Sequence, residues 1–130
     1  MALARGARRL RQEAGGDLSP TMSAGLATVS RHERLTPSEL ASRERIQRPT
    51  ATRLIARLEE QGLVERMADP DDGRSTFIAT TPAGEARLER SRTRRDAFLS
   101  RRLERLAQED RATLARATEI LERLFADERT

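Results

Sequence analysis

The chain has 130 residues, 36% apolar and 35% charged, a length and balance that fit one globular domain. It contains no cysteine, which excludes a disulfide framework, a thiol switch and a cysteine-ligated zinc site. The net charge is +4 and every basic residue is arginine, which favours an acidic partner such as nucleic acid.

The apolar residues predict a lean core and no membrane span. Trp and Tyr are absent and only three Phe are present, so we expect a core of Leu, Ile, Val and Ala that oligomerisation completes. No apolar run approaches the length of a bilayer-spanning helix, and no signal peptide is visible. These features favour a cytoplasmic protein.

Two helices are predicted at the start of the chain. Apolar residues from Leu3 to Ala14 recur at helical spacing and predict a helix over residues 1–14. Ser19 and Pro20 then supply a capping hydroxyl and a proline at the first helical position, which predicts the start of a second helix.

Residues 36–61 predict two further helices joined by a tight turn. Thr36 and Glu39 have the spacing of a capping box, in which each side chain accepts an amide N–H of the first turn. The next helix begins near Arg48, carries four apolar residues on its buried face and ends before Gly62. This pair is a helix-turn-helix arrangement.

A β-hairpin is predicted after the helix-turn-helix. Residues 63–67 and 75–80 have the composition of strands, and residues 68–73 between them are rich in Asp, Pro and Gly, which favour chain reversal. Two helical segments follow, a largely polar one that starts at residue 82 and an apolar-faced one that starts near residue 108.

The second helix of a helix-turn-helix enters the major groove, where each base pair presents its own pattern of donors and acceptors. Opposite its apolar face, this helix carries donors and acceptors and no acid before Glu59, whereas an ordinary surface helix would more often include one. The predicted base-edge contacts are Gln47, Arg48, Thr50 and Thr52, and the predicted phosphate contacts are Arg53 and Arg57. The predicted DNA-binding set also includes Thr36, Ser38 and Pro49.

The tip of the hairpin is a second candidate contact. An arginine on a projecting β-loop, here Arg74, suits a narrow minor groove with its high negative potential. Asp72 is placed to pair with Arg74 or a neighbour and to fix its direction. The alternative is a plain turn with an exposed ion pair, which contributes little to stability.

An enzyme is the rival class, and the sequence argues against it. His32 is the only histidine and stands among charged residues in a connector, so no Ser/His/Asp or Cys/His set is present. No glycine-rich phosphate loop and no cluster with metal-ligand spacing occurs. We expect no catalytic site, cofactor or metal.

Five segments follow one another in a specific order: LSPT, LTPSELA, PTATRLIARLEEQGLVER, DPDDGRS and TPAGEARL. With them, residues 18–126 resemble the MarR family of winged-helix transcriptional regulators. The resemblance implies a mainly α fold with a small β-hairpin wing. It implies a winged helix-turn-helix over residues 18–81, a connecting helix over 82–98, and dimerisation helices over 1–17 and 99–126.

The resemblance also implies a homodimer on a palindromic operator of double-stranded DNA, more often a repressor, which many members release on binding a small aromatic or phenolic molecule. Asp72 and Arg74 match the Asp-x-Arg pair of the family's wing. By their placement, the residues expected to line an effector site are Met22, Leu26, Phe98 and Arg102. The alternative is a winged-helix module for dimerisation or protein binding without sequence-specific DNA binding.

Overall fold

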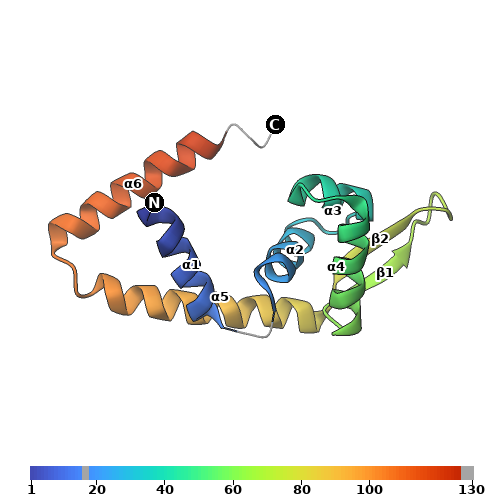
Figure 1. The fold of residues 1–130 in the computed structure, drawn as a ribbon, viewed down its shortest axis with the longest axis horizontal. Coiled ribbons are helices and arrows are strands. Elements are labelled where there is room, and N and C mark those ends of the chain that lie inside the picture. The colour runs from blue at the N-terminus through green and yellow to red at the C-terminus, as the bar shows by residue number, and fades with distance from the viewer. Residues whose placement is uncertain (16–17, 127–130) are drawn as a thin grey trace. The chain divides into compact units, whose positions relative to one another are not determined.

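The computed structural model describes residues 1–15 and 18–126, which form six helices and two strands (Figure 1). The elements are α1 (Ala2–Ala14), α2 (Pro20–Arg31), α3 (Pro37–Glu44), α4 (Arg48–Glu60), β1 (Val64–Ala68), β2 (Thr76–Thr80), α5 (Pro82–Leu103) and α6 (Gln108–Ala126). The chain divides into two compact units, and the boundary after Arg95 lies within α5. None of the helices in the described part is long and apolar enough to cross a bilayer.

The helix starts predicted from capping residues are confirmed. The Ser19 hydroxyl accepts the backbone N–H of Met22 at 3.2 Å and Pro20 occupies the first helical position of α2. At the start of α3 the Thr36 hydroxyl accepts the N–H of Glu39 at 3.2 Å, and the Glu39 carboxylate accepts the N–H of Thr36 at 3.4 Å. Both helices therefore begin where local hydrogen bonding satisfies amides that have no partner inside the helix.

The turn between α3 and α4 depends on one left-handed residue. Arg45 has φ 55° and ψ 45°, a conformation that side chains other than glycine adopt at some cost. The following residue, Ile46, donates its backbone N–H to the carbonyl of Ala41 at 3.0 Å and packs against the core. The turn thereby joins α3 to α4 within three residues.

The strands β1 and β2 pair antiparallel, with Val64 opposite Thr80 and Ala68 opposite Thr76. They form an arm that extends beyond α4 (Figure 1). Leu35 adds a bridge on the other side of β2, since its N–H and C=O bond the C=O and N–H of Ile78 at 3.0 and 2.7 Å. This bridge ties the connector before α3 to the middle of β2.

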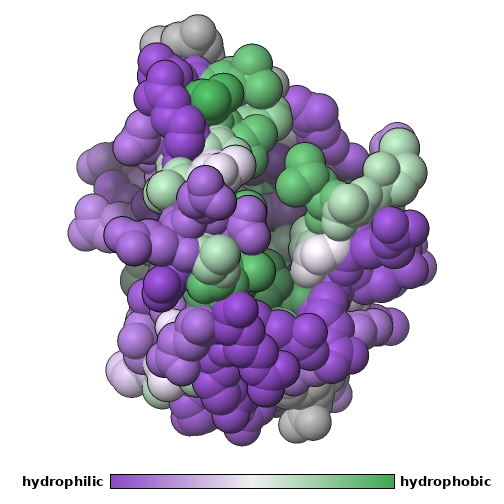
Figure 2. Space-filling model, turned by 90° about the vertical axis from the view of Figure 1, so that its left-hand side faces the viewer, coloured by the Kyte–Doolittle hydropathy of each residue, from purple (hydrophilic) through white to green (hydrophobic). Residues whose placement is uncertain are grey.

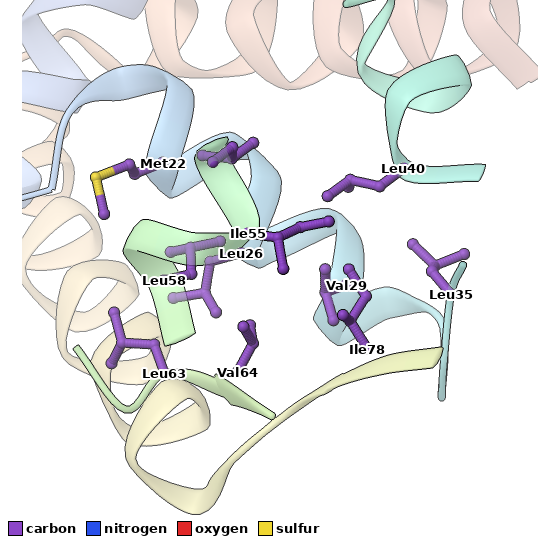
Figure 3. Close-up of a cluster of buried hydrophobic side chains, with 11 residues drawn as sticks. Met22, Leu26, Val29, Leu35, Leu40, Ile55, Leu58, Leu63, Val64 and Ile78 are labelled. Carbon is purple, nitrogen blue, oxygen red and sulfur yellow. The ribbon is translucent and has the colours of Figure 1, made fainter. Parts of the chain in front are cut away.

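One apolar cluster holds α2, α3, α4 and the hairpin together (Figure 3). Its members are Met22, Leu26, Val29, Leu35, Leu40, Leu54, Ile55, Leu58, Leu63, Val64 and Ile78. A Cβ at Gly84 would overlap the carbonyl oxygen of Leu63, so glycine is needed where the start of α5 lies against the end of the α4–β1 connection. Within the described residues this core cluster contains no aromatic side chain, in line with the composition.

The second unit carries large apolar side chains at its surface. The part of α6 that the structure describes, Gln108–Ala126, has no buried residue. Its large apolar side chains are exposed, with Leu114 at 47%, Ile120 at 46% and Leu124 at 64%. Figure 2 shows hydrophobic side chains at the surface among hydrophilic ones.

Candidate nucleic-acid interface

The helix α4 is fixed to the core along one face and exposed along the other. Ala51, Leu54, Ile55 and Leu58 are at most 4% exposed. On the opposite side every predicted contact residue of α4 reaches the surface. Thr50 is half-buried and the exposed residues are Gln47, Arg48, Pro49, Thr52, Arg53 and Arg57. The packing therefore leaves donors and acceptors on the outer face, as a helix that reads a groove requires.

Two side chains near the start of α4 and α3 already make local hydrogen bonds. The Thr52 hydroxyl donates to the carbonyl of Arg48 at 3.0 Å, so its oxygen lone pairs remain to accept a bond from a base amino group. The Thr36 hydroxyl serves as the cap of α3, whereas Ser38 is exposed in the first turn of the same helix. Gln47 precedes α4 without a side-chain capping bond.

The tip of the hairpin is ordered by its own carboxylates. Asp72 Oδ1 accepts the backbone N–H of Arg74 at 3.0 Å, and Asp72 Oδ2 accepts the Ser75 hydroxyl at 3.2 Å. Asp69 accepts the N–H of Asp71 at 2.9 Å in the same way. Within the described residues no ion pair joins Asp72 to the Arg74 guanidinium. The acids thus shape the main chain of the turn, and Arg74 extends from it exposed.

The hairpin is anchored to the helix-turn-helix by two side-chain contacts that the sequence did not suggest. Arg66 of β1 pairs with Glu59 near the end of α4, with Nε and Oε1 3.1 Å apart. The Arg34 guanidinium lies over the Phe77 ring of β2, 4.6 Å from its centroid. These contacts supplement the buried packing of Val64 and Ile78 against α4 in the core cluster, which presents the two candidate DNA-binding elements together.

Comparison with known proteins identifies the arrangement. The MarR family model matches residues 18–76. The HTH-type transcriptional regulator Mb0904 of Mycobacterium bovis is 31% identical over 122 residues, which cover 93% of this chain and 85% of that protein. The chain belongs to the MarR family. The family is one of transcriptional regulators, not of enzymes, and the predicted family and its winged helix-turn-helix are confirmed.

Solved structures share the fold over almost the whole MarR-family chain. YusO of Bacillus subtilis superposes with a TM-score of 0.78 at 24% identity, covering 94% of this chain and 90% of YusO. A point mutant of MepR from S. aureus, solved bound to an oligodeoxyribonucleotide, has a TM-score of 0.73 at 22% identity, with 95% of each chain covered. The predicted mainly α fold with a β-hairpin wing is therefore confirmed.

A buried hydroxyl joins α2 to α3 in this MarR-family lobe. Thr28, 3% exposed, donates a hydrogen bond to the Glu44 carboxylate and accepts Arg31 Nη2 at 3.1 Å. The His32 ring, half-buried rather than exposed, donates from Nδ1 to the carbonyl of Thr28 at 2.9 Å. Nothing in the sequence marked Thr28 or its partner sixteen residues away.

Glu85 in the first turn of α5 links three elements. Its Oε1 accepts the Thr80 hydroxyl at the end of β2 at 2.6 Å and the Ser30 hydroxyl of α2 at 2.8 Å. The Thr80 bond first and the Ser30 bond second lower the pKa of Glu85, burial raises it, and the positive charge of Arg92 lowers it further. The carboxylate is therefore held ionised at the junction of α2, the wing and α5.

The four residues predicted to line an effector site divide between the two units. Met22 and Leu26, 6% and 0% exposed, belong to the core cluster. Phe98 and Arg102 belong to the second unit, where the guanidinium lies 4.9 Å from the ring centroid. A cavity of about 730 Å³ lies elsewhere in the first unit, between α1, α2 and α5, and none of the four lines it. Their role in effector binding stays a prediction.

The described residues were also compared with the ligand sets that hold metal ions in proteins. Across residues 1–15 and 18–126, no three His, Cys, Asp or Glu side chains are grouped so that they could hold a metal ion. The carboxylates near the wing instead accept hydrogen bonds from neighbouring amides, hydroxyls and arginines.

Proposed function

We propose that this MarR-family chain is a homodimeric repressor that binds a palindromic site in double-stranded DNA and is released by a small-molecule effector. The observation that supports it most is the outer face of α4, where arginine, threonine and glutamine side chains are exposed while the inner face is fixed in the core. A rigid helix with donors on its free face suits readout of the major groove.

In this proposal α4 and the wing contact different parts of the duplex. The start of α4, with Arg48 and Thr52, reads base edges, and Arg53 and Arg57 further along bind phosphates. Arg74 at the wing tip enters the adjacent minor groove. The S. aureus MepR mutant with the same fold was solved with an oligodeoxyribonucleotide, which supports DNA as the partner.

Dimerisation is proposed through the second unit. The exposed apolar side chains of α6, among them Ile120, Leu121 and Leu124, need a partner surface to be removed from water. Two copies would then present their α4 helices about 34 Å apart, one turn of DNA. Leu121→Glu with Leu124→Glu should yield a monomer by light scattering, with the helical circular dichroism of the lobe retained. A variant that stays dimeric would rule out this interface.

The proposal is tested by selecting fragments of the source genome bound by the full chain and sequencing them. We expect one enriched palindromic motif, whose affinity for the protein falls steeply as salt rises. Enrichment of no motif, with dimerisation intact, would favour the alternative of a protein-interaction module. The curated relatives are bacterial, so we place this activity in the cytoplasm, where bacterial DNA lies.

A further inference from the structure

Three of the described residues have a backbone with positive φ, and two of them are glycines. Gly15 follows α1 with φ 69°, and Gly62 comes after α4 with φ 71°. The third is Arg45 at the end of α3, with φ 55° and ψ 45°. Glycine is the usual residue with this conformation after a helix, because it has no Cβ to crowd the following carbonyl oxygen. The turn of the helix-turn-helix therefore has an arginine where the ends of α1 and α4 have glycine.

The hydrogen bonds of the turn require the left-handed conformation of Arg45. The N–H of Ile46 donates to the carbonyl of Ala41 at 3.0 Å, and the N–H of Arg45 donates to the carbonyl of Ser42 at 3.3 Å. This is the pattern of a Schellman motif, which closes the last turn of a helix through a left-handed residue. The motif also directs Ile46 to the core cluster, against which it packs. Only backbone atoms make these bonds, so they account for the conformation and not for the arginine.

The side chain of Arg45 has no structural partner among the described residues. It is exposed, and its guanidinium makes neither an ion pair nor a hydrogen bond within the part of the chain that the structure describes. A positive charge at the C-terminal end of a helix interacts favourably with the helix dipole, but Arg43 in the last turn of α3 already supplies one. Contacts within the protein therefore do not explain why arginine occupies a strained position.

Arg45 stands just before the residues that are proposed to read base edges. Three peptide units separate it from Arg48, so the Cα atoms of the two residues lie at most about 11 Å apart. The major groove is about 12 Å wide, so an exposed side chain beside the reading residues lies over the phosphates at the edge of the groove. A guanidinium group binds phosphate oxygens through paired N–H donors. Position and chemistry thus both suit a phosphate contact.

We propose that Arg45 binds a DNA phosphate and that the strained backbone at this position is kept for that contact. The proposal rests on the proposed DNA-binding function and adds a contact made by the turn, in addition to those of α4 and the wing. The Schellman motif holds the backbone of Arg45 in place, which reduces the conformational freedom that the side chain loses on binding. Glycine at this position should give a more stable protein that binds DNA less tightly.

The first measurement is urea unfolding of the full chain without DNA, at one protein concentration. Arg45→Gly should raise the urea midpoint, because glycine adopts positive φ without crowding a Cβ. Gly62→Ala is the matched control and should lower the midpoint. Nothing lies within 4 Å of a Cβ built at Gly62, so the loss measures the backbone conformation and not a clash. An Arg45→Gly variant less stable than the wild type would show that the arginine holds the fold, and would overturn the proposal.

The second measurement is DNA affinity as a function of salt, on a duplex with the selected motif and on an unrelated duplex. Arg45→Gly should weaken binding by about threefold or more on both duplexes and reduce the slope of log K against log salt by about 0.9 for each lost phosphate contact. Arg45→Asn, which is uncharged and tolerates a left-handed backbone, should show the same loss. Arg45→Lys keeps the charge and should keep the slope. Wild-type affinity and slope in Arg45→Gly would overturn the proposal.

Two further variants separate this contact from DNA binding as a whole. Arg53→Ala removes a predicted phosphate contact of α4, and Arg90→Ala removes the same charge from the exposed surface of α5. If Arg53→Ala lowers the slope and Arg45→Gly does not, the role of Arg45 is wrong while the proposed function stands. If Arg90→Ala lowers the slope as much as Arg45→Gly, the effect is one of net charge and the contact is rejected. A wild type that binds neither duplex would overturn the proposed function and this contact with it.

Discussion

The carboxylate of Asp72 accepts a hydrogen bond from the backbone N–H of Arg74, with Oδ1 and N 3.0 Å apart. The acid therefore orders the turn and does not neutralise the arginine. Asp72→Asn keeps an acceptor oxygen in place of Oδ1, and we expect it to retain most of the DNA affinity. Asp72→Ala removes the acceptor and should weaken binding markedly. Equal losses in the two variants, measured by fluorescence anisotropy, would instead favour an ion pair.

Arg74 is predicted to act through the minor groove. Arg74→Ala should weaken binding more on operators with AT-rich flanks than with GC-rich flanks, because a narrow AT-rich minor groove has the more negative potential. The measurement is the ratio of affinities on two operators that differ only in the flanks. The same loss on both operators would reject minor-groove insertion.

Arg53 and Arg57 are exposed on α4 beyond the predicted base-reading residues. Arg53→Ala or Arg57→Ala should weaken binding to all DNA sequences alike and reduce the slope of log K against log salt by about 0.9 for each lost phosphate contact. Arg90→Ala on α5 is the control, since it removes the same charge away from α4. If Arg90→Ala reduced the slope of log K against log salt as much, Arg53 and Arg57 would not be phosphate contacts.

Arg48 and Thr52 stand at the start of α4, and Thr52 retains only its acceptor lone pairs for a base. Arg48→Ala or Thr52→Ala should relax preference at one or two base pairs, at about 1–3 kcal/mol for each lost base contact. The measurement compares affinities for operators that carry every single base change. A uniform loss across all operators would place these residues on the phosphate backbone.

Glu85 makes stability depend on pH in the acid range. Its pKa in the folded state is lowered below the ordinary value of 4.5, chiefly by the Thr80 hydroxyl, then by Ser30 and Arg92. The ionised group therefore stabilises the fold above 4.5 and loses this effect as the pH falls through the lowered pKa. Urea unfolding should show the wild type more stable than Glu85→Gln at about pH 7, and the difference should narrow as the pH falls below 4.5 through the lowered pKa. If the stability difference between the two proteins did not depend on pH, ionisation of the Glu85 carboxylate would not be its cause.

Structural features that depend on residues close together in the chain could be predicted from the sequence. Ser19 and Thr36 cap helices through partners three residues away, and Gly62 has the positive φ of 71° expected just after α4. The four buried residues of α4 also followed, because helical spacing alone decides which side chains share a face. The family could be predicted from the order of five sequence segments, from LSPT to TPAGEARL.

Contacts between distant segments could not be predicted from the sequence. The bridge of Leu35 to Ile78 and the bonds of Glu85 to Ser30 join residues more than forty apart along the chain. Exposed hydroxyls and carboxylates occur throughout this sequence, and nothing in their spacing marks which of them meet. The effector residues expected from the resemblance were likewise spread between the core and the second unit, whereas the cavity is lined by others.

The sequence by itself determined the helices, the turn, the hairpin and the outward face of α4, because capping and periodicity act over a few residues. Only the tertiary structure decided which arginines share a cavity, what Asp72 accepts and how the wing is held. These depend on the angles at which packed elements meet, and those angles are set by the whole core rather than by any one segment.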